Sequence, residues 1–142
     1  MFSKPKNGWT EITISDDISE FKAPASYITN IPNDCLDTFI YALENHCSVV
    51  IDFDAEGWEY KLICSEYDTY IIEDKDECKV YHFNITLNKI VKEFLNDLEN
   101  NIEDWVLWDC YDDDDDETIM SDILYDIYVD KINKLKRLLK IK

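Results

Sequence analysis

The most conspicuous chemical feature of this sequence is a run of five aspartates and a glutamate that directly follows several aromatic residues. Carboxylates attract a positively charged partner over long distances, and aromatic rings beside them supply buried contact area. The pattern predicts a contact surface for a basic protein, with a solvated, self-repelling loop as the alternative. Trp105 is expected to complete the core, whereas Trp108 is expected to be exposed. The predicted contact residues are Trp108, Tyr111, Asp112, Asp113, Asp114, Asp115, Asp116 and Glu117.

A second group of acidic and aromatic residues surrounds a predicted hairpin turn. Asp52 and Asp54 share one face of a strand, because side chains two residues apart point to the same side. Glu56 lies in the turn, and Trp58 begins the next strand. Paired carboxylates could serve acid–base chemistry or bind Mg²⁺, but the polar face of a half-solvated strand is the preferred interpretation. As a second group of acids beside an aromatic residue, these four residues are also predicted as a contact patch for the basic partner.

Signals for catalysis or metal binding are weak. The acidic run has no glycine and lacks the oxygen spacing of an EF-hand, so calcium binding is kept only as an alternative to the contact surface and the solvated loop. His46 and His82 could each meet a cysteine in space, but no spacing supports a Cys–His pair. Two glycines in the whole chain cannot build a glycine-rich phosphate cradle. No catalytic residue, metal ligand or cofactor is predicted, and the protein is expected not to be an enzyme.

The charge balance narrows the class of partner. Asp and Glu number 32 against 14 Lys and Arg, which gives a net charge of −18. Such a chain repels nucleic acid and anionic lipid and attracts basic proteins. All charged residues among 131–142 are basic. They are expected to complement the dipole at a helix C-terminus rather than to form an arm that binds nucleic acid. With no apolar run of about 18 residues and no secretory signal, a cytoplasmic protein with no membrane contact is expected.

Hydrophobic periodicity predicts a single α+β domain over residues 1–142. It consists of an antiparallel meander sheet of four or five strands with two or three packed helices. Residues 1–8 are expected to be a loose leader, and residues 16–31 irregular because Pro24 and Pro32 interrupt them. One helix is expected to begin at a capping Asn33 and another at Thr86. The other expected elements are strands at 9–14, 48–54, 58–64, 69–73 and 79–85, and a last helix from about 118.

This small, strongly acidic α+β organisation resembles the immunity proteins of bacterial polymorphic-toxin and contact-dependent growth inhibition systems. Residues 49–105 carry most of the resemblance, with the sequence VVIDFDAEGWEYKLICSEYDTYIIEDKDECKVYHFNITLNKIVKEFLNDLENNIEDW. The resemblance implies a cytosolic antidote that binds one cognate toxin, such as a basic nuclease, and blocks its active site or its access to substrate. It carries over no binding residue.

The sequence alone leaves three other functions open. A nucleic-acid mimic would occupy many DNA-binding proteins rather than one partner. A small metal-dependent enzyme would need a cleft that gathers a histidine with cysteines or carboxylates. A scaffold module would not depend on its acidic charge. The oligomeric state is not predicted.

Overall fold

The computed structural model describes residues 1–108 and 117–140, without the side chains of residues 117–120. Within these residues it has two antiparallel sheets and four helices, which confirms the α+β class and the four-stranded meander. The elements in chain order are β1 (Trp9–Ser15), β2 (Glu20–Ser26), α1 (Ile31–Asn45), β3 (Val49–Asp54), β4 (Glu59–Cys64), β5 (Thr69–Asp74), β6 (Cys78–Phe83), α2 (Leu87–Asn100), α3 (Ile102–Trp105) and α4 (Glu117–Leu138).

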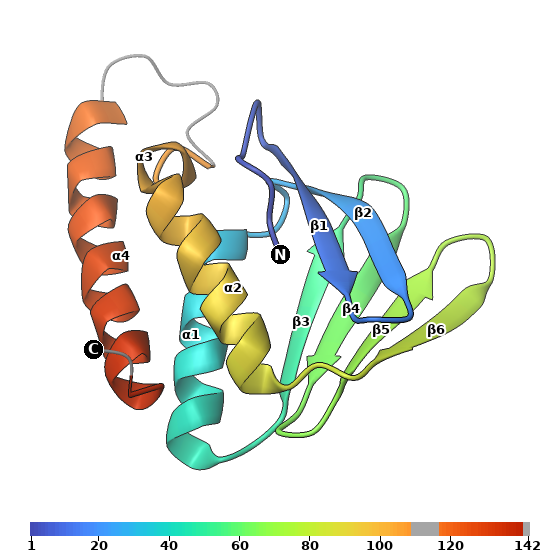
Figure 1. Ribbon diagram of the computed structural model, residues 1–142. Coiled ribbons are helices and arrows are strands. Elements are labelled where there is room, and N and C mark those ends of the chain that lie inside the picture. The colour runs from blue at the N-terminus through green and yellow to red at the C-terminus, as the bar shows by residue number, and fades with distance from the viewer. Residues whose placement is uncertain (109–116, 141–142) are drawn as a thin grey trace.

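The meander is formed by β3 to β6 in sequence order, joined by short turns. Alternate residues of each strand point to opposite faces, and the inward set is apolar. Val49, Ile51 and Phe53 of β3 are buried, as are Tyr60 and Leu62 of β4. Figure 1 shows α1, α2 and α4 gathered on one side of the molecule and the strands on the other, with β6 as the outermost strand.

A second hairpin corrects the expectation that residues 16–31 are irregular. β2 pairs with β1 in an unbroken register, and Pro24 lies opposite Glu11. A proline is tolerated here because both strands of a two-stranded sheet are edges. Phe21, Ala23 and Ala25 are buried and alternate with exposed residues, so β2 contributes to the core.

The N-terminal residues are part of the core, contrary to the expectation of a loose leader. Phe2 is 6% exposed. Its ring lies 6.1 Å from Phe53, 5.8 Å from Phe94 and 5.6 Å from Trp105, each pair in edge-to-face geometry. Its backbone N–H donates to the carboxylate of Asp97 on α2. The first residues therefore join β3, α2 and α3.

Helix boundaries follow the local capping chemistry. α1 begins at Ile31 rather than after Asn33, because Pro32 fits a first turn whose N–H groups need no partner within the helix. α2 begins as expected after Thr86, whose side chain accepts the N–H of Lys89 at 3.3 Å. It ends at Asn100.

The basic C-terminal segment is largely engaged with neighbouring helices. Lys131 Nζ lies 2.6 Å from Asp37 and Lys134 Nζ 2.6 Å from Glu44, both on α1. Lys136 pairs with Glu99 of α2. These lysines link α4 to α1 and α2, a role that helix-dipole reasoning does not include. Among the described residues, no helix combines the length and apolarity that crossing a membrane requires.

Candidate functional site

The outward face of the meander is the principal candidate surface, because side chains along it remain wholly or partly exposed. Strand register places its residues in three rows that run across all four strands. The rows are Val50, Ile63, Tyr70 and His82; Asp52, Lys61, Ile72 and Val80; and Asp54, Glu59, Asp74 and Cys78. An antiparallel sheet often leaves one face to solvent, and that face is usually polar.

The middle of this face is apolar, which departs from that pattern. Val50 is 56% exposed and Val80 is 63% exposed. Ile63, Tyr70 and Ile72 lie between them and are half-buried. Contiguous exposed apolar surface with a polar rim is typical of protein interaction sites. We call these five residues the apolar strip.

One end of the apolar strip is bounded by carboxylates. Asp54 is directly opposite Glu59, and Glu59 is directly opposite Asp74. Like charges that face each other across strands destabilise a sheet. Among the described residues, none of the three forms an ion pair. We call Asp54, Glu59 and Asp74 the acidic row; its arrangement suits the binding of external cations better than it suits stability.

The predicted hairpin patch lies beside the acidic row. Asp54 Oδ1 accepts the N–H of Glu56 at 2.7 Å and holds the turn, in which Glu56 has a φ of 53°. Asp52 pairs with Lys61, and this hydrogen bond raises the pKa of Lys61. The charge of Asp52 is thus compensated, whereas Asp54 and Glu56 lack an ion pair among the described residues. Figure 1 shows this turn at the end of β3 and β4.

Trp58 is only half-exposed, because its ring packs 5.4 Å from that of Tyr60. Lys75 Nζ lies 5.1 Å from the ring centroid of Trp58, at cation–π distance. Together with the acidic row these two residues line a shallow hollow of 410 Å³. Lys75 therefore already supplies one positive charge at the edge of this hollow.

A hydrogen-bonded cluster occupies the opposite end of the face. Asp68 accepts from the hydroxyl of Ser65 at 2.9 Å, from the hydroxyl of Tyr70 at 3.1 Å and from Nε2 of His82 at 3.1 Å. The bond from Ser65, helped by those from His82 and Tyr70, lowers the pKa of Asp68. Serine and histidine both bind the carboxylate rather than each other, so the cluster lacks the serine–histidine contact of a hydrolase triad.

The remaining histidine lies elsewhere. His46 and Cys47 follow α1 and line a separate hollow of 440 Å³. His46 adopts a left-handed conformation with φ of 52°, which ends the helix. In the part of the chain that the structure describes, no three His, Cys, Asp or Glu side chains are grouped as metal ligands.

The first predicted contact patch falls mostly outside the described residues. Tyr111 and residues 112–116 are not described, and Glu117 begins α4 without a described side chain. The expected exposure of Trp108 is wrong. Trp108 is 2% exposed, and its Nε1 donates to the carbonyl of Thr29 at 2.9 Å. The chain turns after α2, and this turn directs the indole inward.

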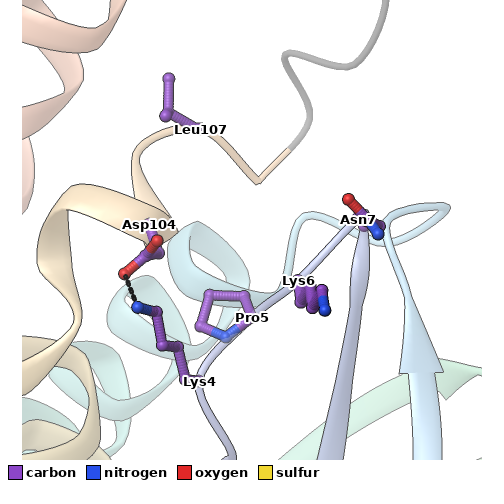
Figure 2. Close-up of a pocket in the computed structure, with 7 residues that line it drawn as sticks. Lys4, Pro5, Lys6, Asn7, Asp104 and Leu107 are labelled. Carbon is purple, nitrogen blue, oxygen red and sulfur yellow. Dashed lines mark ion pairs between the residues drawn. The ribbon is translucent and has the colours of Figure 1, made fainter.

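A hollow of 790 Å³ that the sequence gave no reason to expect lies between the N-terminal segment and α3 (Figure 2). Lys4 and Lys6 come from the segment, and Asp104 and Leu107 come from α3 and the turn after it. Lys4 Nζ lies 3.6 Å from Asp104, so one of the two lysines is paired.

Comparisons of the chain with protein-family models, with curated proteins and with solved structures found no match in any of the three.

Proposed function

We propose that this protein is a non-enzymatic immunity protein that acts in the cytoplasm and neutralises one cognate basic toxin by covering its active site. The observation that carries the proposal is the acidic row of Asp54, Glu59 and Asp74 beside the uncovered apolar strip. An acidic rim next to apolar area is the composition of a steered protein interface. The net charge of −18 and the resemblance of residues 49–105 to immunity proteins point the same way.

Binding would proceed in two stages. Long-range attraction orients the basic partner and raises the association rate constant, which reaches about 10⁸–10⁹ M⁻¹s⁻¹ in strongly steered pairs at low salt. The apolar strip then excludes water and slows dissociation. Association should therefore fall steeply as salt rises, while dissociation should depend on the apolar residues.

The test begins with capture of partners from lysate of the source cells at low salt, followed by elution in a salt gradient. The eluted protein is identified, purified and assayed for its own activity with and without this chain. One stoichiometric basic partner whose activity is lost on binding is the expected result. Broad capture of many DNA-binding proteins would contradict the proposal and favour nucleic-acid mimicry.

Charge-matched variants then locate the contact. Replacing the acidic row with Asn, Gln and Asn should slow association about tenfold or more at low salt. The control replaces three exposed acids away from the meander, Glu11, Asp17 and Glu103, and removes the same net charge. Equal slowing by both triple variants would show that net charge alone steers the partner and would refute the assigned surface.

The acidic run 112–116 remains a predicted contact. Replacing its five aspartates with asparagine should slow association more than it changes the free energy of unfolding. An unchanged association rate with the captured partner would remove this segment from the interface and leave the acidic row as the contact.

A further inference from the structure

The backbone edge of β6 is a second feature of the same face. β6 is the last strand of the meander, and among the residues that the structure describes no strand lies beyond it (Figure 1). β3, the strand at the other edge, lies against α1 and β2. An open edge presents a row of unpaired N–H and C=O groups that can pair with another chain.

β6 has little of the protection that open edges usually carry. Its six residues contain no proline, and its register with β5 is unbroken from Cys78 to Phe83, with no bulge. Lys79 is its single charged residue, and Nζ of Lys79 lies 3.9 Å from Glu77 in the preceding turn. Proline, bulges and charged side chains, lysine above all, are the usual obstacles to pairing at an edge, and of these β6 has only Lys79.

The side chains of β6 extend both surfaces of the sheet to this edge. On the outward side, Val80 continues the apolar strip next to Ile72. On the inward side the ring of Tyr81 lies 5.1 Å from that of Phe21 and remains half-exposed. A strand added here would have Val80 beside its outward side chains, and Lys79 and Tyr81 beside its inward side chains.

The charge around β6 indicates which kind of chain could pair with its open edge. Asp74, Asp76 and Glu77 lie in and beside the turn that leads into the strand, and Asp68 contacts His82 near the other end. A second copy of this chain would bring another net charge of −18 to the same edge. An extended segment in which apolar residues alternate with lysine or arginine fits both the side chains and the charge.

We propose that β6 pairs with an extended basic strand of the partner protein, which adds a fifth strand to the meander. Main-chain hydrogen bonds supply the pairing, Val80 contacts the apolar side chains of the added strand, and the flanking carboxylates meet its cations. The inference rests on the proposed function, because it takes the partner to be a basic protein.

The first test uses a defined probe, a short capped peptide that alternates valine and lysine. Amide hydrogen exchange is measured on the full chain with and without the peptide. Slower exchange concentrated in β6 supports the proposal. A control peptide of equal charge carries proline in place of a central valine and cannot form a continuous ladder. Equal binding of the two peptides, or protection spread over other acidic surface, overturns strand addition.

The second test uses two matched valines on the outward face. Val80→Lys and Val50→Lys change the net charge equally, at exposed positions on the two edge strands. Val80→Lys should weaken binding of the alternating peptide, and of the captured partner, about tenfold more than Val50→Lys. Equal weakening would mean that the partner covers the whole face without pairing with β6.

The two proposals fail in different ways. A captured toxin that is inhibited while exchange of the β6 amides is unchanged refutes strand addition and leaves the immunity function intact. A peptide that protects β6 while lysate yields no basic partner refutes the immunity function and leaves the edge a strand-binding site.

Discussion

Two neighbouring buried indoles differ in a single hydrogen bond, and this difference can be measured. Trp105 is 1% exposed and Trp108 is 2% exposed, with ring centroids 5.2 Å apart. Nε1 of Trp108 donates to the carbonyl of Thr29 at 2.9 Å, whereas Nε1 of Trp105 has no acceptor among the described residues. Replacing each indole with phenylalanine removes an N–H and a similar amount of ring.

The cavity costs of the two substitutions are similar, so their difference isolates the hydrogen bond. Trp108→Phe removes one of the two N–H groups that the Thr29 carbonyl accepts, the other being that of Ile31, at a cost of about 0.5–1.5 kcal/mol. Trp105→Phe removes a buried, unpaired donor and relieves its desolvation. Trp108→Phe should therefore lower the free energy of unfolding by about 2 kcal/mol more than Trp105→Phe.

Urea unfolding followed by far-ultraviolet circular dichroism measures this difference without relying on tryptophan emission. With a slope of about 2 kcal/mol per molar urea, the two midpoints should differ by about 1 M. Equal midpoints, or a lower midpoint for Trp105→Phe, would refute the assigned hydrogen bond. An exposed Trp108 would instead change stability by less than about 0.5 kcal/mol on substitution.

Three further outcomes are expected from the packing and charge contacts. Phe2→Ala should cost about 3–5 kcal/mol and lower the thermal midpoint by roughly 10 °C, and a midpoint within error of the parent would contradict its core position. Asp16 accepts three backbone N–H groups that lower its pKa below 3.8, so its stabilisation is present above the unfolded pKa and is lost as pH falls. Acid titration of stability should thus be shallower for Asp16→Asn, and identical slopes would refute this linkage. Lys131→Met removes the contacts of Lys131 with Asp37 and Asn33. It should lower the free energy of unfolding, measured with urea, by about 1 kcal/mol. An unchanged free energy of unfolding would show that these contacts do not stabilise the packing of α4 on α1.

Elements with strong periodicity could be predicted from the sequence, and those with weak signals could not. α2 repeats apolar residues at helical spacing, and β3 alternates large apolar residues with aspartates. β2 alternates as well, but two of its buried residues are alanines and Pro24 lies among them, so its pattern is faint. The sequence does not place Phe2 in the core, because the neighbouring residues are polar and include a proline.

The placement of Trp108 shows how a local geometric change defeats extrapolation. Projecting α2 at a constant angle per residue puts Trp108 at the margin of its apolar face. The helix ends at Asn100, and Asn101 has φ of −131° and ψ of 28°, so the following residues start on a new axis. Sequence alone does not supply that reorientation.

The sequence predicts only part of the candidate site. Asp54 and Trp58 are close in sequence, and their common turn indicated a shared patch. Asp74 joins Asp54 only through Glu59, because pairing of β4 with β5 sets the register. A slip of one residue would move Asp74 to the opposite face, so the acidic row depends on turn geometry that composition does not reveal.

The position of Phe2 has a consequence for the protein while it is being made. Its ring partners are Phe53, Phe94 and Trp105, so Phe2 is synthesised well before the residues that it packs against. At about 5–20 residues per second, roughly 3–10 s separate the synthesis of Phe53 from that of Trp105. The hairpins of the meander make local contacts and can form during this interval. In the nascent chain the ring of Phe2 therefore lacks its full set of aromatic partners until α3 has been synthesised.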